Sequence, residues 1–208
     1  MTITELGPMG VKPDMNIMDP STPEGQILHQ AWNTCVTKPG GPRRIYYGLE
    51  SADPSKIWGF FDFDSVEQHR QFAEEYGAEA VKDLPKICTH GEFTKHVKMI
   101  PSSDVLGSPF TEILLAYFPH DVSKEKQEDL SVQLQEILKS FEDFPGVTKL
   151  AHGWGVENDF PARSENGKPR SVLMAFVGWF SSDALQLSAG ADEYKEHLER
   201  ASQTQIES

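Results

Sequence analysis

Two side chains that can hold or move a proton occupy matching places in the two halves of the sequence. His152 lies in the run 149–154 (KLAHGW), and Tyr47 lies in the run 44–49 (RIYYGL), 105 residues earlier. An imidazole changes its charge near neutral pH, and a phenol can donate a hydrogen bond to a developing enolate or phenolate. We therefore take His152 as a candidate general base or acid and Tyr47 as a candidate catalytic hydrogen-bond donor.

Strand geometry predicts the surroundings of His152. Successive side chains of a strand point to opposite faces, so His152 shares a face with Leu150, Trp154 and Val156. These apolar neighbours should desolvate the ring and lower its pKa, which would make it a neutral base at neutral pH. The alternative is structural: His152 would be a core histidine bonded to a backbone carbonyl, and Tyr47 would only pack.

The remaining histidines are weaker candidates. His120 follows a predicted strand, where it could reach the mouth of a cavity, and it is our third candidate catalytic residue. His29 lies about one turn from Trp32 on a predicted helix and could point toward a sheet. His69 and His197 fall on predicted helices, where solvent-facing positions explain them most simply.

Four residues of types that bind metals fall on one face of a predicted strand, 87–99. They are Cys88, His90, Glu92 and His96. The opposite face is apolar, so this face is expected to be the solvent side of an edge strand. Side chains on one face of a strand are spaced about 7 Å apart, which is too far for sharing one ion. We therefore expect no metal here.

Aromatic side chains are candidates for the wall of a binding site. Aromatic rings dominate core packing wherever they occur, so the set first of all predicts a hydrophobic core. Because the central strands are apolar on both faces, part of the set should line a cavity suited to a flat hydrophobic ligand. The residues that we expect to bind substrate are Trp154, Phe61, Phe118, Phe176 and Phe180.

The chain contains an internal repeat. Three short blocks recur in the same order: 44–49 matches 149–154, 58–61 (WGFF) matches 177–180 (VGWF), and 77–82 (GAEAVK) matches 190–195 (GADEYK). The offsets are 105, 119 and 113 residues, and they change where loops are expected. The collinear order indicates a duplicated unit.

Each copy is predicted to alternate strands and helices. The first copy has helices at 22–36, 65–76 and 78–84 and strands at 43–50, 56–63 and 87–99. The second has strands at 111–118, 147–156 and 171–180, a helix capped by Ser123 that runs to Phe141, and a broken helix over 183–187 and 191–201. This order is that of the ferredoxin-like fold.

We therefore predict an α+β protein with two ferredoxin-like units in tandem, their sheets packed face to face as an alpha-beta barrel. The first unit covers residues 1–100, including an N-terminal extension, and the second covers 105–208. The second copy lacks a clear last strand, because only the polar segment 202–208 follows its helix. The N-terminal segment 2–12 could take that place, or the sheet edge could stay open.

Composition excludes several classes of function. The chain has 208 residues and a formal charge of -13, which disfavours contact with nucleic acid or anionic lipid. It has no glycine-rich dinucleotide loop and no P-loop. No apolar run could span a bilayer, no signal peptide is evident, and two cysteines fit neither a disulfide framework nor a zinc site. We expect a cytoplasmic protein without the usual signals for a dinucleotide or nucleoside triphosphate, which binds neither nucleic acid nor membrane.

Two units of this kind resemble a fused form of the dimeric alpha-beta barrel superfamily. The resemblance rests on the aromatic strand, Gly-Phe-Phe or Gly-Trp-Phe, that leads into a helix beginning Asp-Ser-Val or Ser-Asp-Ala, and it covers residues 22–201. The superfamily includes cofactor-free antibiotic-biosynthesis monooxygenases, polyketide cyclases, muconolactone isomerases, EthD-like proteins and some heme-binding enzymes.

The resemblance implies a cofactor-independent enzyme of secondary metabolism. Its substrate would be a hydrophobic aromatic or polyketide-type small molecule, and His152 would transfer a proton inside one barrel. A cyclase or isomerase is preferred to a monooxygenase, because enolisation needs only the histidine and the tyrosine. A non-catalytic binding module and a heme-dependent enzyme are the alternatives. A homodimer is compatible with the sequence, although tandem fusion already supplies the pairing that single-unit relatives achieve as dimers.

Overall fold

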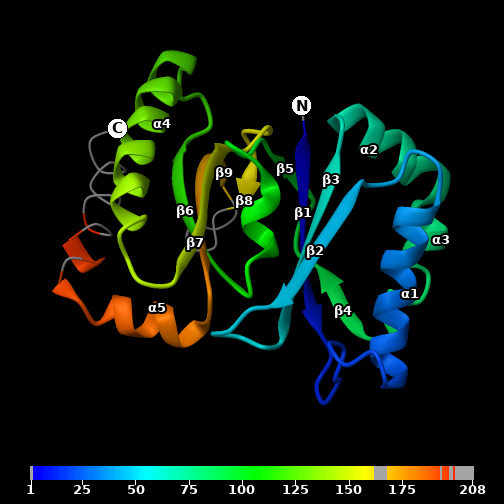
Figure 1. Ribbon diagram of the computed structural model, residues 1–208. Coiled ribbons are helices and arrows are strands. Elements are labelled where there is room, and N and C mark those ends of the chain that lie inside the picture. Colours follow the sequence, from blue (N-terminus) through cyan, green and yellow to red (C-terminus); the bar gives the residue numbers. More distant parts are fainter. Residues whose placement is uncertain (1, 162–167, 193, 197–198, 200–208) are drawn as a thin grey trace. The chain divides into compact units, whose positions relative to one another are not determined.

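The computed structural model describes residues 2–161, 168–192, 194–196 and 199 (Figure 1). The chain forms two compact units, Met1–His96 and Val97–Ser208. Each contains an antiparallel sheet with helices packed on one face, so the α+β class is confirmed. The packing of one sheet against the other stays a prediction of the sequence.

The first unit has the ferredoxin-like strand order β2-β3-β1-β4, and β5 also pairs with β1. Its strands are β1 (Ile3–Val11), β2 (Arg44–Leu49), β3 (Lys56–Phe63), β4 (Cys88–Gly91) and β5 (Lys95–Val97). The expectation that residues 2–12 are an extension or complete the second sheet is wrong. They form the central strand of the first sheet, paired with β3 from Ile3 against Phe63 to Gly10 against Lys56.

Pro8 explains why the predicted strand 87–99 is broken into β4 and β5. A proline has no N–H to give to a neighbouring strand. The segment between β4 and β5 leaves the sheet beside Pro8. There the Glu92 N–H donates a hydrogen bond to the Pro8 carbonyl, at 2.8 Å. After the break, His96 is buried, with 5% of its surface exposed, instead of facing solvent as expected.

The helices of the first unit cover one face of its sheet (Figure 1). They are α1 (Pro23–Thr37), α2 (Val66–Phe72) and α3 (Ala78–Val81), with a π-helical turn (Ala73–Gly77) between α2 and α3 and a 3₁₀ turn at Leu84–Lys86. Thr22 caps α1 by accepting a hydrogen bond from the Gly25 N–H at 3.0 Å, and Pro23 occupies the first turn. The buried side of α1 packs on the sheet through Leu28, Trp32 and Cys35.

The second unit has the strand order β6-β9-β7, and β8 also pairs with β9. Its strands are β6 (Phe110–Pro119), β7 (Val147–Trp154), β8 (Phe160–Pro161) and β9 (Pro169–Trp179); its helices are α4 (Lys124–Phe141) and α5 (Ser182–Ala189), and a 3₁₀ turn lies at Ser103–Gly107. Ser123 caps α4 as predicted, by accepting from the Lys126 N–H. The segment 202–208, and part of the helix predicted at 191–201, lie outside the described residues.

The chain that enters the second unit runs along the outer edge of β7. Backbone hydrogen bonds join Ile100 and His152 in both directions, at 2.7 and 2.9 Å, and the Lys98 N–H bonds the Trp154 carbonyl at 3.2 Å. A Cβ atom at Gly153 would lie 2.0 Å from the Lys98 carbonyl oxygen, so only glycine permits this approach. The strand that carries His152 is therefore held from both sides.

Sheet register relates the two units residue by residue. One row of paired residues in the first sheet is Tyr47, Gly59 and Gly7, and the corresponding row of the second is His152, Ala175 and Leu114. Ser65 and Ser181 cap the helices that follow β3 and β9, so Gly59 corresponds to Ala175, and the rows of Tyr47 and His152 match. The match of 58–61 to 177–180 is wrong by three residues, because register aligns Phe61 with Val177. The two aromatic blocks look alike in sequence, but in the sheets they are offset by three residues. An odd offset reverses which face of the sheet each side chain occupies.

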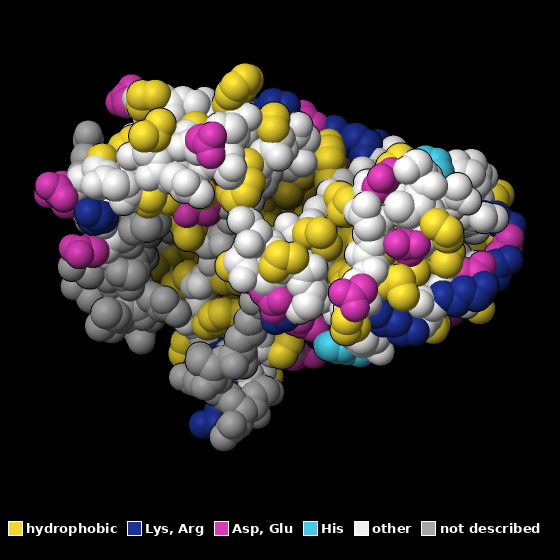
Figure 2. Space-filling model, turned by 90° about the horizontal axis from the view of Figure 1, so that it is seen from below, with side chains coloured by type: hydrophobic (Ala, Val, Ile, Leu, Met, Phe, Trp, Pro, Cys, Tyr) yellow, Lys and Arg dark blue, Asp and Glu magenta, His cyan; other side chains and the backbone are white. Residues whose placement is uncertain are grey.

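Charged groups of both signs cover the surface. On the face shown in Figure 2, acidic and basic side chains of the described residues lie among one another. Exposed ion pairs such as Lys38 with Glu79 and Lys86 with Asp83, both at 2.7 Å, contribute little stability. No helix in the described part of the chain is long and apolar enough to cross a membrane.

Candidate functional site

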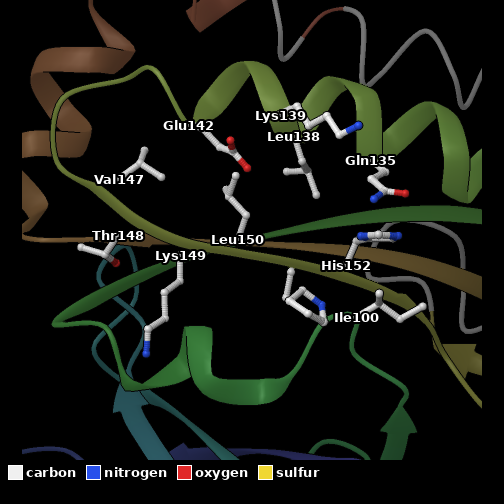
Figure 3. A pocket seen from close by; sticks show the side chains of 12 residues that line it. Ile100, Gln135, Leu138, Lys139, Glu142, Val147, Thr148, Lys149, Leu150 and His152 are labelled. Carbon is white, nitrogen blue, oxygen red and sulfur yellow. The ribbon is translucent and has the colours of Figure 1, made fainter.

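A cavity of about 450 Å³ lies in the second unit between β7 and α4 (Figure 3). Leu150 and His152 project from β7 toward the helix, and Gln135, Leu138 and Glu142 project from α4 and its C-terminal cap toward the strand. The lining is therefore partly apolar, with an imidazole, an amide and a carboxylate at its margin. The volume is in the range of roughly 300–1,000 Å³ that is typical of small-molecule sites.

His152 is the titratable group that strand β7 brings into this cavity. Its backbone is fixed between Ile100 on one side and Ala175 of β9 on the other. The residue is 6% exposed, and burial lowers the pKa of the imidazole below its ordinary value of 6.5. His152 is therefore a neutral imidazole at neutral pH.

The structural explanation of His152 requires a hydrogen-bond partner for its ring. Within the part of the chain that the structure describes, neither a backbone carbonyl nor a side chain bonds the ring nitrogens. The ring nitrogens of His152 are not among the fully buried, unpaired side-chain atoms of the described residues, so they can meet a ligand in the cavity. This arrangement supports the functional reading of His152.

Trp154 and Phe118 share the helix-facing side of the sheet with His152 and lie next to the cavity, outside its lining. The Trp154 indole N–H donates to the Gln127 carbonyl at 3.1 Å and to the Ser131 hydroxyl at 3.0 Å. Its ring centroid is 5.3 Å from that of Phe118. Trp154 thus ties β7 to α4 and closes one end of the space between them.

Three of the predicted site residues lie elsewhere in the second unit. Phe176 is fully buried but points to the opposite face of the sheet, because its neighbours Ala175 and Val177 face the helices. Phe180 follows the end of β9 and is 72% exposed. His120 lies in the exposed turn after β6. The structure does not bring these residues to the cavity.

The other two predicted residues belong to the first unit. Tyr47 is half exposed, and its ring centroid lies 6.1 Å from that of Trp32. Phe61 is buried, and its ring meets Trp32 edge-on at 5.0 Å. Both therefore face α1, on the side of their sheet that corresponds to the His152 side in the second unit.

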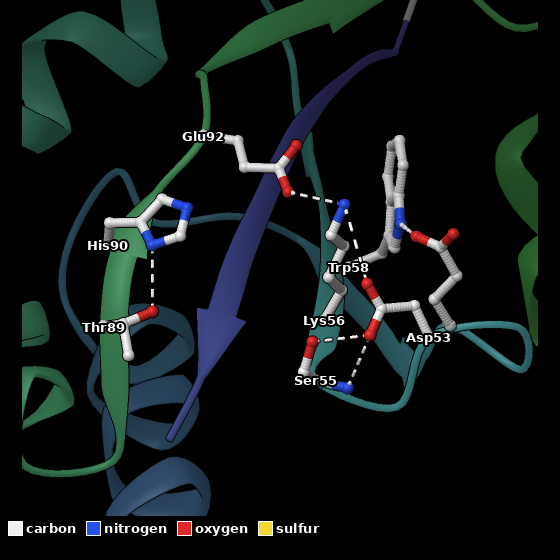
Figure 4. A network of polar contacts seen from close by, with 8 residues as sticks. Asp53, Ser55, Lys56, Trp58, Thr89, His90 and Glu92 are labelled. Atoms are coloured by element: carbon white, nitrogen blue, oxygen red, sulfur yellow. Dashed lines mark hydrogen bonds and ion pairs between the residues drawn. The ribbon is translucent and has the colours of Figure 1, made fainter. Parts of the chain in front are cut away.

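The four residues considered as metal ligands do not converge. The Thr89 hydroxyl is 2.9 Å from Nδ1 of His90, and Glu92 pairs with Lys56 at 3.4 Å (Figure 4). His96 bonds another histidine, and Cys88 is buried as a free thiol. No group of three or more potential ligands among the described residues could hold a metal ion.

A second cluster of titratable groups, which the sequence analysis missed, lies in the first unit. His69 on α2 is 3.2 Å from a carboxylate oxygen of Glu5 on β1 and 2.8 Å from the ring of His96 on β5. The assignment of His69 to a solvated helix face is therefore wrong. A signal existed: once 3–11 is taken as a strand, alternation places Glu5 on the apolar face with Met9 and Val11.

Comparison with known proteins bears on the fold. The sequence matches no family profile and no curated protein. Among solved structures, a candidate monooxygenase from Fusobacterium nucleatum is similar over 98% of this chain and 87% of its own chain, with 12% sequence identity and a TM-score of 0.56. A candidate monooxygenase from Lactobacillus acidophilus is similar over 97% of this chain and 87% of its own, with 16% identity and a TM-score of 0.55. An anthrone oxidase-like protein is similar over 96% of this chain and 84% of its own, with 15% identity and a TM-score of 0.59.

At these identities the likeness shows the fold. It extends over both units, so the predicted fold of two ferredoxin-like units in tandem is confirmed.

Proposed function

We propose that the protein is a cofactor-independent enzyme that acts on a hydrophobic, aromatic or polyketide-type small molecule, and that His152 begins the reaction by removing a proton. The observation that carries this proposal is the buried imidazole without a partner at the margin of a partly apolar cavity. A neutral imidazole has a free lone pair, and burial keeps it in that form. The cyclase or isomerase class and the oxygenase class both start from this step.

The cavity also offers groups for the charge that proton removal creates. Gln135 and Lys139 line it together with His152, and an amide N–H or an ammonium group can donate to a developing enolate or phenolate oxygen. Leu138 and Leu150 supply apolar surface for the rest of the ligand. The expected substrate is therefore a flat molecule with a C–H that is acidic because it is conjugated with a carbonyl group, directly or through an aromatic ring.

Two outcomes of proton removal balance without a cofactor. The carbanion can take the proton back at another carbon or attack a carbonyl group of the same molecule, which gives an isomer or a cyclised product. It can instead give its electrons to dioxygen, so that a CH₂ group becomes C=O and the second oxygen atom leaves as water. The likeness to two candidate monooxygenases and an anthrone oxidase-like protein supports the second course.

A substrate panel tests the proposal. The purified protein is incubated with anthrone and hydroxylated anthrones in air and under argon, while oxygen uptake and product masses are measured. We expect oxygen-dependent formation of the quinone above the uncatalysed rate, and a loss of about 100-fold or more in His152→Gln, as for removal of a general base. The control is His90→Gln, on a surface strand of the first unit.

Other results would separate the alternatives. Product formed equally well under argon would assign the isomerase or cyclase course. Ligand that is retained but recovered unchanged would indicate the binding module. A His152→Gln variant as active as the wild type would contradict the role of His152.

A further inference from the structure

Glu5, His69 and His96 form a chain of three titratable side chains in contact with one another in the first unit. Nε2 of His69 lies 3.2 Å from Oε2 of Glu5, and Nδ1 of His69 lies 2.8 Å from Nε2 of His96. The three groups come from a strand, a helix and a second strand, so the fold itself assembles them. Because both ring nitrogens of His69 are engaged, the groups are connected in series.

The chain is buried at one end and reachable at the other. His96 is 5% exposed, whereas the side chains of Glu5 and His69 each keep 14% of their surface exposed. The ring of Phe63 lies 4.9 Å from that of His69 and covers it. A small molecule could therefore meet the chain at the Glu5 end, with His96 as the protected end.

The charged and titratable neighbours of Glu5 are few. Burial raises the pKa of Glu5 to about 7, so this carboxyl can both take up and release a proton near neutral pH. From α1, Cys35 faces the same space, and burial with the charge of Glu5 raises its pKa to about 11, so it stays a neutral thiol. Asp62 lies on the opposite face of the sheet, bonded to Thr4 and Arg44.

The contacts at 3.2 and 2.8 Å give a path for proton movement along this chain. With the proton on Glu5, the carboxylic acid donates to Nε2 of His69, and Nδ1–H of His69 donates to His96. Transfer of the first proton to Nε2 and of the second to His96 leaves a Glu5 carboxylate that accepts from His69. Two short hops thus carry one proton from the accessible end to the buried end, with no net change in charge.

An unsatisfied donor lies in the same apolar cluster. Trp32 is 7% exposed, and its indole N–H has no hydrogen-bond partner among the described residues. Its ring meets that of Phe61, which is paired with Glu5 across β1 and β3, and Cys35 follows one turn later on α1. A buried N–H without a partner is costly, and a ligand oxygen would satisfy it.

We propose that Glu5, His69 and His96 form a second acid–base site, in which Glu5 exchanges a proton with a small, planar, uncharged weak acid whose oxygen accepts a bond from Trp32. Glu5 is the catalytic residue of this site. His69 and His96 are positioning residues that relay and hold the proton. The site lies wholly within the first unit and does not depend on the proposed role of His152.

The test uses 5-nitrobenzisoxazole, a planar molecule with an acidic C–H and nitro oxygens. When a base removes this proton, the C–H electron pair forms a nitrile, the N–O bond breaks, and a coloured cyanonitrophenolate is released. The full-length protein should accelerate this reaction, and Glu5→Gln should lower the accelerated rate by about 100-fold or more. His96→Gln should shift the pH profile of the rate, which a merely structural residue would not do.

Matched variants keep this inference separate from the proposed function. The surface variant His90→Gln should leave the rate with this probe unchanged, and Glu5→Gln should lower the rate in a His152→Gln background as it does in the wild type. If His152→Gln removes the activity and Glu5→Gln does not, the reaction belongs to the second unit and the second acid–base site is wrong. No acceleration by the wild type would also overturn it.

Carbon-13 NMR provides a measurement that needs no ligand. The Glu5 carboxyl signal, identified by its loss in Glu5→Gln, should titrate near pH 7. Titration of this signal near pH 4.5 would contradict the buried carboxyl. Circular dichroism of each variant verifies that the fold is retained.

Discussion

The two units place a buried carboxyl group at the same position of their sheets and surround it differently. Glu5 shares a row with Phe61 and Ile45, and Glu112 shares the equivalent row with Val177 and Leu150. Desolvation by burial raises the pKa of both carboxyl groups. Glu5 meets a histidine, whereas Glu112 accepts a 2.5 Å hydrogen bond from the Tyr194 hydroxyl.

This difference shows how one duplicated scaffold can hold two kinds of carboxyl site. Burial raises the pKa of Tyr194 far above its ordinary value, and Glu112 adds to the rise, so the phenol keeps its proton at physiological pH. Glu5 instead lies 3.2 Å from an imidazole nitrogen of His69. The same sheet position thus supports a mobile proton in the first unit and a fixed hydrogen bond in the second.

In the row next to each carboxyl group, it is the second unit, and not the first, that carries a histidine. Tyr47 of the first unit, half exposed, stands where the second unit has the buried His152. Each unit therefore has imidazole chemistry on a different element: on a helix and an edge strand in the first, and on β7 in the second. The predictions below test whether these paired positions differ in function as they differ in environment.

Exchange of the residues at the paired positions should have the largest effect. His152→Tyr replaces the neutral imidazole by a phenol with an ordinary pKa of about 10, which cannot serve as a base at neutral pH. Turnover of an anthrone should fall about 100-fold or more, whereas Tyr47→His should leave it unchanged. Steady-state kinetics with circular dichroism on each variant provides the measurement. Equal rates for His152→Tyr and wild type would remove the functional difference between the two positions.

Trp154 and Leu49 are the next pair of equivalent positions, and they should differ in stability. Trp154→Ala removes a large ring from the space between β7 and α4 together with its bonds to Gln127 and Ser131, which should cost about 3–4 kcal/mol. Leu49→Ala, at a half-exposed site, should cost less than about 1 kcal/mol. Urea denaturation measures both. Similar losses for the two variants would contradict the assigned environments.

The sequence predicted most elements because their local signals agree with the final packing. Ser123 caps its helix as expected, and the apolar strand 56–63 has the predicted bounds. The segment 2–12 was expected as an extension or as a strand of the second sheet, because the sequence does not show which strand β1 pairs with. The structure tolerates Pro8 at the centre of the sheet only because the neighbouring strand is interrupted beside it, and this is a tertiary effect that no local pattern contains.

The candidate site was predictable to the extent that it depends on alternation along one strand. His152, Leu150 and Trp154 share a face as expected, although this face meets α4 and the cavity lies between sheet and helix. Phe176 and Phe180 were misplaced because aromatic content does not reveal which face of a strand a residue occupies. The contact between Glu5, His69 and His96 joins elements far apart in the chain, so spacing could not predict it.

The pH dependence of stability should distinguish Glu5 from surface carboxyl groups. Its pKa is raised from 4.5 to about 7 in the folded protein, so its contribution to stability is complete below pH 4.5 and is lost as the pH rises through 7. Glu5→Gln stays neutral, and its stability relative to the wild type should improve by up to about 3 kcal/mol between pH 4.5 and 8.5. Urea denaturation at both pH values measures the change. Glu74→Gln, at an exposed site, should show no such dependence, and the same absence in Glu5→Gln would contradict the buried carboxyl.

The smallest effect is expected at the fixed hydrogen bond of the second unit. Tyr194→Phe removes only the hydroxyl that bonds Glu112 and leaves the ring against Phe141 and Phe144. The carboxyl group then loses its donor while staying buried, which should cost about 1–2 kcal/mol. Tyr47→Phe, at the half-exposed position, should change the free energy of unfolding by less than about 0.5 kcal/mol. Urea denaturation measures both variants at one pH. A Tyr194→Phe variant as stable as the wild type would show that the bond to Glu112 contributes nothing, and the contrast between the two carboxyl groups would then rest on Glu5 alone.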